Sequence, residues 1–191
     1  RINKMKKLLY TFLAVSISFS ACEEDTTLPA TNNNNSTLAI GDTHQGGIIF
    51  YLDGNGGGLI AAPSDQGMAE WGCNGITISG ADGITIGTGA QNTIDIEVDC
   101  TTPGTAADIC NNLSLGGYSD WYLPSKDELN EMYLNIANGS LLGNVGGLNF
   151  SYYWSSTEID SNEAWVQFFQ TLYQSNHTKN STYYVRAVRS F

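Results

Sequence analysis

The chain has 191 residues, enough for one domain with additional segments, and 41% of them are hydrophobic, enough for a folded core. The formal charge is −11. Setting aside residues 1–21, which hold four basic and no acidic residues, leaves four basic and 19 acidic residues, a net charge of −15. A chain this acidic repels phosphate and sulfate polymers, so nucleic acid is excluded as an expected partner.

Residues 1–21 have the pattern of a secretory signal peptide. Met5-Lys6-Lys7 gives a charged start, and the apolar run at 8–20 is too short for a comfortable membrane span. Phe19-Ser20-Ala21-Cys22 resembles a bacterial lipobox, in which the cysteine is lipidated after cleavage. The mature protein is therefore expected to be a lipoprotein that carries palmitate or a similar acyl chain on Cys22. The alternative is an ordinary secreted protein with a cysteine here by chance.

Residues 22–37 are expected to form a disordered tether between the lipidated cysteine and a folded domain at 38–191. Asn32 to Asn35 are consecutive, and the segment has too little apolar surface to fold. Glu23-Glu24-Asp25 resembles the acidic export signal of bacterial surface lipoproteins. This indicates a lipid-anchored protein of the bacterial outer membrane, exposed at the cell surface.

Strands are predicted where aromatic and β-branched residues gather between turn residues. They comprise residues 47–52, 58–62, 121–123, 152–157, 164–169 and 183–188. Residues 53–57, Asp-Gly-Asn-Gly-Gly, are typical of a hairpin turn. Their spacing also resembles the start of a calcium loop, but Ser64 stands where that loop needs a glutamate. We therefore expect a turn and no metal site.

The clearest helix signal follows Trp121-Tyr122-Leu123-Pro124. Ser125 and Glu128 form a capping box, in which each side chain bonds a backbone N–H that the helix start leaves unpaired. The apolar positions that follow at helical spacing are Leu129, Met132, Tyr133 and Ile136. Asn138-Gly139 is expected to end the helix, because this pair tolerates a left-handed backbone.

Two other segments give weaker signals. Residues 105–113 predict a short helix with Cys110 on its apolar face. Residues 91–98 fit either a short helix or a strand, because several of them are β-branched. The glycine-rich stretch that precedes them is expected to be a loop with short extended pieces.

Three cysteines besides Cys22 lie in the domain, so one disulfide and one free thiol are expected after export. Cys73–Cys100 is the favoured pair, because Cys110 can serve as a core residue of its helix. Cys100–Cys110 is the alternative. Their spacing contains no C-x-x-C and no paired histidine, so a zinc site is not expected.

Candidate catalytic residues are few, and we expect neither an enzyme nor a cofactor. The two histidines, His44 and His177, have no nucleophilic serine or cysteine motif near them, and G-x-S-x-G does not occur. Asp127 and Glu128 are better explained by the helix cap than as a catalytic pair.

Four motifs in order resemble one family. They are Asp120-Trp121-Tyr122-Leu123-Pro124-Ser125-Lys126-Asp127-Glu128-Leu129, Trp154-Ser155-Ser156-Thr157-Glu158, Ala164-Trp165 and Val185-Arg186-Ala187-Val188-Arg189. Over residues 46–191 the chain resembles the Lcl C-terminal domain family of collagen-like adhesins. The resemblance implies a single α+β domain of C-type-lectin-like fold, related to formylglycine-generating enzymes, with short helices and small antiparallel sheets. It also implies a ligand-binding role in adhesion.

The resemblance does not carry enzyme or calcium chemistry to this chain. No catalytic cysteine pair matches, and the lectin calcium tripeptides E-P-N and W-N-D do not occur. The acidic charge disfavours the sulfated glycans that the family's namesake binds. Trp121, Trp154 and Trp165 are expected in the core. Arg186 and Arg189 are expected to pair with acids such as Asp120 or Glu158.

Residues 159–182 are the candidate binding segment. In a strand alternate side chains face opposite sides, so if Trp165 and Phe169 face the core, Val166 and Phe168 face outward. The residues expected to contact a ligand are Asp160, Ser161, Asn162, Val166, Phe168, Gln170, Thr171, Tyr173, Ser175 and His177. The segment resembles the diversified regions of some lectin-like lipoproteins. The alternative is an ordinary polar loop.

Together these features predict a surface-exposed lipoprotein whose lectin-like domain binds an extracellular protein or glycan. An enzyme acting on envelope glycans and a structural envelope protein without a specific ligand are the alternatives. Perturbed titratable groups clustered in a deep pocket would favour the enzyme. A shallow face of aromatic and polar residues would favour binding.

Overall fold

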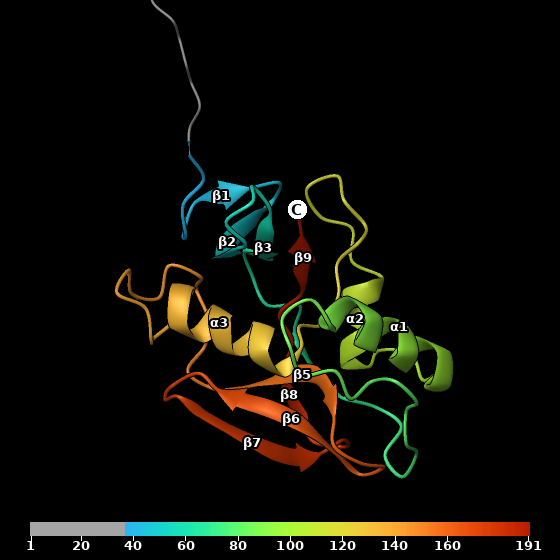
Figure 1. Cartoon of the computed structure of the whole chain (residues 1–191). Coiled ribbons are helices and arrows are strands. Elements are labelled where there is room, and N and C mark those ends of the chain that lie inside the picture. Colours follow the sequence, from blue (N-terminus) through green and yellow to red (C-terminus); the bar gives the residue numbers. More distant parts are fainter. Residues whose placement is uncertain (1–36) are drawn as a thin grey trace, which may run out of the picture. The chain divides into compact units, whose positions relative to one another are not determined.

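The computed structural model describes residues 37–191. The expectations for the signal peptide, Cys22 and the tether fall outside these residues, apart from residue 37 at the tether's end. The described part has an α+β architecture of short helices and two small sheets (Figure 1). Within it, no helix has both the length and the apolar character needed to cross a membrane.

The first sheet has the strand order β1-β2-β3-β9, and all its neighbours are antiparallel. Its strands are β1 (Thr43–His44), β2 (Gly47–Leu52), β3 (Gly58–Ala61) and β9 (Val188–Ser190). The predicted turn joins β2 to β3. Its form is set by Asp53, whose Oδ1 accepts hydrogen bonds from the backbone N–H groups of Asn55 (2.7 Å) and Gly57 (3.0 Å).

The second sheet has the strand order β4-β8-β5-β6-β7. Its strands are β4 (Met68–Glu70), β5 (Tyr152–Glu158), β6 (Glu163–Phe168), β7 (Tyr173–Thr178) and β8 (Thr182–Tyr184). β5 and β8 are parallel and all other pairs are antiparallel. β7 was not predicted as a strand, since the sequence Tyr-Gln-Ser-Asn-His-Thr lacks an apolar alternation.

The single strand predicted at 183–188 is wrong. Residues 185–187 leave the second sheet and enter the first, so this segment ends one sheet and begins the strand of another. Arg186 is buried within the crossing. Its Nη1 donates to the carbonyl oxygens of Ala62 and Gly146, both at 2.8 Å.

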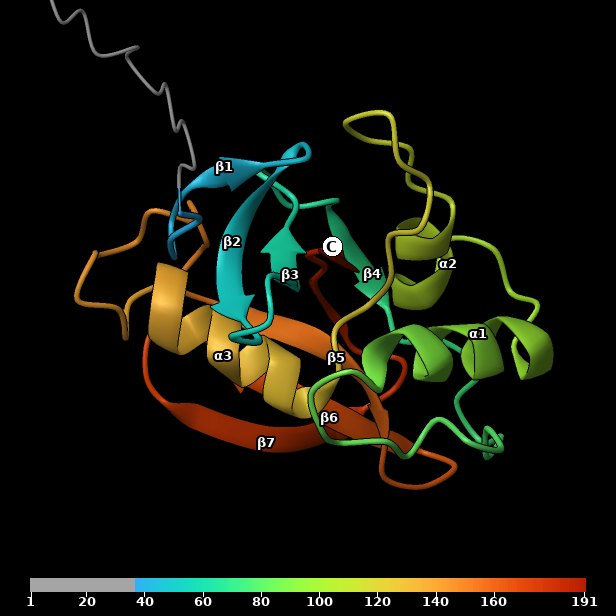
Figure 2. The same ribbon diagram turned by 45° about the horizontal axis from the view of Figure 1, so that its top comes forward.

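The predicted helix after Ser125 is confirmed as α3 (Lys126–Ile136), with both hydrogen bonds of the capping box present. α3 lies between the two sheets (Figures 1 and 2). The end of the helix differs from the prediction. Ala137 caps it with an extended backbone, and Gly139 is needed for space, because a Cβ there would lie 2.6 Å from the ring of Tyr133.

The two remaining helices are α1 (Gly89–Asp99) and α2 (Ala106–Asn111). α1 settles the open choice at 91–98 in favour of a helix. Cys73 and Cys100 form the predicted disulfide, which joins the segment after β4 to the end of α1. Cys110 is a buried free cysteine on α2, as expected.

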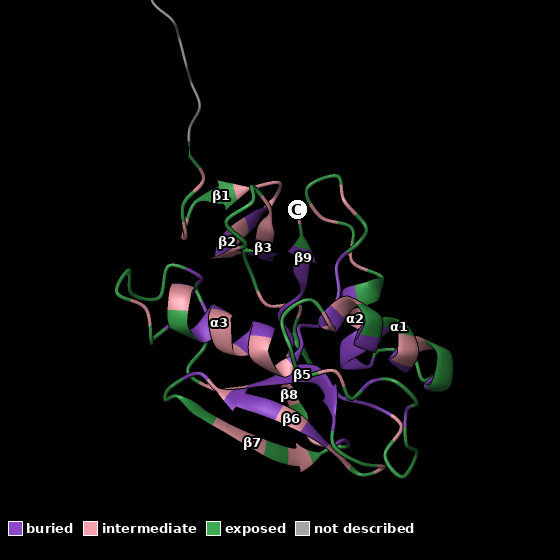
Figure 3. Cartoon of the chain, in the orientation of Figure 1, coloured by how far each residue is buried: buried purple, intermediate pink, exposed green. Residues whose placement is uncertain are grey.

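Two clusters of buried side chains form the core, and Figure 3 colours the buried residues purple along the ribbon. Trp121 and Trp154 are buried as predicted, whereas Trp165 is only half-buried. The predicted strand at 121–123 is reduced to one bridge. Tyr122 and Val188 exchange two backbone hydrogen bonds of 2.9 Å, which fasten the start of α3 to β9.

Leu129 and Leu134 of α3 offer a matched test of this packing, since their exposed fractions are 1% and 36%. Leu129→Ala should lower the free energy of unfolding by about 2–5 kcal/mol, because it leaves a cavity between the sheets. Leu134→Ala should cost about 1 kcal/mol or less. Urea denaturation of both variants measures the difference, and equal losses would show that α3 is not the element packed in the core.

Candidate ligand-binding face

The strand register divides the side chains of β5, β6 and β7 between two faces. Residues directly opposite each other in neighbouring strands place their side chains on the same side of the sheet. Val166 pairs with Ser175, and Phe168 pairs with both Tyr152 and Tyr173. We call this side the outer face; it comprises Tyr152, Trp154, Ala164, Val166, Phe168, Tyr173, Ser175 and His177.

The opposite side of the sheet is covered by α3. The Nζ of Lys126 lies 3.7 Å from the ring centre of Trp165, and the ring of Phe169 meets Tyr133 edge-on at 5.7 Å. The Nε2 of Gln167 donates to the Oδ1 of Asn130 at 3.3 Å. The predicted alternation along β6 is therefore confirmed: Trp165 and Phe169 face α3, and Val166 and Phe168 face the other way.

Aromatic rings from four strands gather on the outer face. The rings of Tyr152 and Phe168 stack with centres 4.7 Å apart, and His177 lies 4.8 Å from Tyr152. Tyr183 of β8 joins them, 5.3 Å from Tyr152. All four are half-buried, and Tyr173 beside them is 54% exposed. Figures 1 and 2 show no helix or strand over this side of β6 and β7.

The prediction that Val166 contacts a ligand is wrong, because its side chain is 1% exposed. The alternation of side chains along β6 correctly predicted the side of the sheet on which Val166 lies, but it does not predict how far a side chain is buried. Val166 lies opposite Trp154 in the register, and both belong to one of the buried core clusters. Phe168 is half-buried and presents part of its ring.

The other predicted contact residues do not all reach the outer face. Asp160, Ser161 and Asn162 form the turn between β5 and β6, where the Oδ1 of Asp160 accepts from the backbone N–H of Asn162 at 2.7 Å. Gln170 and Thr171 form the turn at the opposite end of β6. A six-residue strand separates the two turns by about 17 Å. We call these two turns the rims of the outer face, because they lie at its two ends. Of the predicted contact residues, Phe168, Tyr173, Ser175 and His177 have their side chains on the outer face itself.

His177 contributes no charge to the outer face near neutral pH. Burial lowers the pKa of its ring below the ordinary value of 6.5, and the nearby carboxylate of Glu163 acts weakly in the opposite sense. Its Nδ1 shares a short hydrogen bond with the hydroxyl of Tyr183. The outer face thus combines aromatic surface with hydroxyl and imidazole groups.

The four basic side chains at 37–191 are all engaged within the domain. Arg186 pairs with Asp65 at 2.6 Å, not with Glu158, and Arg189 pairs with Asp120 as predicted. Lys126 lies over Trp165, as above. The fourth, Lys179, was not singled out from the sequence. It is buried in an ion pair with Glu158, donates to the carbonyl oxygen of Ile76 at 2.8 Å and lies over Trp71.

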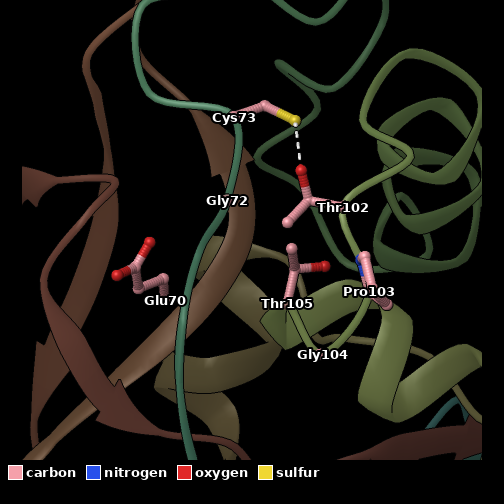
Figure 4. Close-up of a pocket in the computed structure, with 7 residues that line it drawn as sticks. All are labelled: Glu70, Gly72, Cys73, Thr102, Pro103, Gly104 and Thr105. Carbon is pink, nitrogen blue, oxygen red and sulfur yellow. Dashed lines mark hydrogen bonds between the residues drawn. The ribbon is translucent and has the colours of Figure 1, made fainter.

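A hollow of about 250 Å³ lies beside the disulfide (Figure 4). Its lining residues are Glu70, Gly72, Cys73, Thr102, Pro103, Gly104 and Thr105. Two of them already have structural roles: Cys73 is in the disulfide, and the Oγ1 of Thr105 caps α2. Within residues 37–191 no group of three or more histidine, cysteine or acidic side chains is placed to hold a metal ion.

Glu128 and Tyr153 have raised pKa values, and both lie in the core outside the lining of this hollow. Burial raises the pKa of Glu128, which accepts 2.8 Å hydrogen bonds from the backbone N–H groups of Ser125 and Gly87. Burial also raises the pKa of Tyr153, whose hydroxyl donates to Asp65 at 2.9 Å. Both groups are closed off by packing and serve the fold.

A family model described as the Lcl C-terminal domain matches residues 70–189. No curated protein sequence matches the chain. Among solved structures, a fimbrial protein from Bacteroides ovatus ATCC 8483 is similar, with a TM-score of 0.47 and 16% identity over 69% of this chain and 35% of that one. The chain spans about a third of that protein, and a TM-score below 0.5 establishes no common fold.

Lys179→Met should lower the free energy of unfolding by about 3–5 kcal/mol, because it leaves the buried carboxylate of Glu158 without its cation. Lys126→Met is the matched control, since it removes a half-buried cation from a tryptophan ring and should cost about 1 kcal/mol. Chemical denaturation measures both. A smaller loss at Lys179 than at Lys126 would contradict the buried ion pair.

The His177 ring should titrate below pH 6.5 in an NMR titration of the domain. Because folding lowers its pKa, the stability linked to it is fully present above the unfolded value of about 6.5 and is lost as the pH falls through the folded value. The unfolding free energy should therefore fall more between pH 7 and pH 5 in the parent than in His177→Gln. A His177 pKa above 6.5 would contradict this environment.

Proposed function

Because this chain belongs to the Lcl C-terminal domain family, we propose that it is a surface protein that binds an extracellular protein or glycan through the outer face. The observation that carries the proposal is the aromatic group on this face, made by Tyr152, Phe168, Tyr173, His177 and Tyr183. The opposite side of the same strands is closed by α3, so the outer face, with four half-buried rings and the exposed ring of Tyr173, is the side available to a partner.

The composition of the outer face suits recognition. Exposed aromatic side chains supply contact area at a low cost in conformational entropy, and small polar residues adapt their hydrogen bonds. Tyr173 and Ser175 provide one of each on β7. Patches of this mixed kind mark interaction sites on folded domains.

Charge narrows the class of partner. Residues 37–191 hold 16 acidic and four basic residues, a net charge of −12, and the four cations are engaged as described above. An anionic polymer such as a sulfated glycan would meet repulsion without a cation to bind it. The partner is therefore neutral or basic.

The location follows from the lipobox-like residues before the domain. Cys22 is lipidated and residues 22–37 tether the domain to the outer membrane, with the outer face exposed at the cell surface. Residues 159–182, which supply β6, β7 and both rims, are the segment in which diversification would change the ligand without disturbing α3. The fold is a variant of the C-type-lectin-like class, which is supported by the family and by the pairing of β3 with β9.

The role is binding, not catalysis. The shifted groups Glu128 and Tyr153 are buried structural groups, and in the hollow beside the disulfide Cys73 is bonded to Cys100 and Thr105 caps α2. An enzyme acting on envelope glycans would require turnover of a glycan by the purified domain. A purely structural envelope protein would show no specific ligand on any array.

Tyr173→Ser tests the outer face with little effect on packing, because this ring is the most exposed of the group. A glycan and protein array probed with residues 38–191 should give ligands that Tyr173→Ser and Phe168→Ser no longer bind. Tyr173→Ser should stay within a few degrees of the parent in thermal stability. Val98→Ser on α1, at a side chain 71% exposed, is the control and should bind as the parent does. Ligands that survive both outer-face substitutions would place the site elsewhere.

Cys22→Ser in the full chain should release the protein from the membrane fraction, because serine lacks the thiol to which the lipid is attached. Fractionation and mass spectrometry of the mature N-terminus measure the outcome. Retention in the membrane together with an unacylated N-terminus would contradict lipid anchoring.

A further inference from the structure

β7 is the longest free edge in the described part of the structure. It closes the order β4-β8-β5-β6-β7 with six residues, and its only strand neighbour is β6. The other edge strands, β1, β4 and β9, have two or three residues each. Figures 1 and 2 show no element beyond β7.

The backbone of β7 presents unpaired groups along this edge. The N–H of Lys179 donates to the carbonyl oxygen of Asn162 at 2.8 Å, and hydrogen-bonded pairs recur every second residue in an antiparallel ladder. Tyr173, Ser175 and His177 therefore turn their N–H and C=O groups toward β6, as their partners in the register require. Gln174, Asn176 and Thr178 turn theirs outward.

The outward groups have few partners among residues 37–191. The carbonyl of Thr178 accepts from the N–H of Ser181 at 2.8 Å, and that of Asn176 has a 3.5 Å contact with the hydroxyl of Ser175. No backbone hydrogen bond is made by the outward N–H groups of Gln174, Asn176 and Thr178 within this part of the chain. They form a regular row of donors at alternate residues.

β7 also lacks the usual protection of an edge strand. Natural edges are blunted by lysine, proline, bulges or covering segments. The sequence Tyr-Gln-Ser-Asn-His-Thr has no lysine and no proline, and its six pairs with β6 run without a bulge. Such an edge accepts a further strand.

We infer that an extended polypeptide segment, apolar on one side and basic on the other, adds to β7 as a sixth strand of this sheet. The inference rests on the proposed binding role of the outer face and names the class of its partner. In strand addition the main chain gives affinity and alternate side chains give specificity. One set of alternate side chains would lie beside Tyr173, Ser175 and His177 of the outer face.

Charge decides which segment fits. The other set of side chains would lie beside Gln174 and Asn176, on the side where Glu163 bonds the amide of Asn176 and where Lys126 is engaged over the ring of Trp165. β7 itself has no charged side chain, and the domain around it carries a net charge of −12. A second copy would bring the same negative charge to the edge, so two copies repel each other while a basic segment is attracted.

The test uses residues 38–191 and a library of short peptides in which lysine alternates with valine, isoleucine, tyrosine or phenylalanine. A second library, with glutamate in place of lysine, is the charge control. Peptides of the first library should bind and those of the second should not. On binding, hydrogen exchange should slow at the amides of Gln174, Asn176 and Thr178, with no comparable change at Tyr173, Ser175 and His177.

Asn176→Pro removes one outward donor and leaves the pairing with β6 intact, because a proline fits an edge strand when its nitrogen faces outward. It should weaken peptide binding by about tenfold or more, whereas Asn176→Ala should bind as the parent does. Thermal melting confirms that both variants are folded. If Asn176→Pro does not fold, the alternating exchange pattern in the parent decides the question alone.

Several outcomes would overturn the inference. They are equal binding of the two peptide libraries, unchanged affinity in a folded Asn176→Pro, uniform exchange along β7, and dimers that form through β7 in place of peptide binding. A glycan bound by the parent and by Asn176→Pro, but not by Tyr173→Ser, would overturn the strand addition and leave the proposed function standing. Ligands indifferent to Tyr173→Ser and Asn176→Pro would remove both.

Discussion

The structure depends on the buried carboxylate of Glu128. This one side chain accepts a hydrogen bond from the N–H of Ser125, which completes the cap of α3. It also accepts one from the N–H of Gly87, which fixes the loop before α1. Gly89, at the start of α1, packs so closely that a Cβ would lie 2.2 Å from Glu128 Oε2. The starts of α3 and α1 and the loop before α1 are therefore fixed around the carboxylate of Glu128. Its hydrogen bonds to backbone N–H groups offset the cost of burying it.

The position of α3 then determines what the second sheet can do. α3 contacts Trp165 through Lys126, Gln167 through Asn130 and Phe169 through Tyr133, so it meets alternate residues along β6 and just after it. The intervening residues face away from the helix by the geometry of a strand. The packing of α3 thus determines which side chains of β6 are covered by the helix and which lie on the outer face. The outer face and the free edge of β7 meet at Tyr173, so one strand serves both.

Local signals predicted α3, the β2–β3 turn, the side on which Phe168 lies, and the favoured disulfide. The helix, the turn and the side of Phe168 depend on residues close together in the sequence, and the disulfide had only a few possible pairings among three cysteines. Three features depended on distant contacts and were missed. β7 pairs along its whole length with β6, Arg186 in the break at 185–187 bonds the carbonyl oxygens of Ala62 and Gly146, and Lys179 is buried in an ion pair with Glu158. Val166 was misjudged because alternation gives direction and not depth.

The passage of the chain from one sheet to the other at 185–187 also determines when, during synthesis, both sheets can be completed. β8 and β9 lie on either side of it and supply one strand to each sheet, although they are the last strands of the domain. A nascent domain that ends before residue 182 lacks a strand in both sheets and lacks the bond between Tyr122 and Val188 that anchors α3. Stable folding therefore waits until synthesis of the domain is finished. Until then the polypeptide lacks the closed core that the complete domain has.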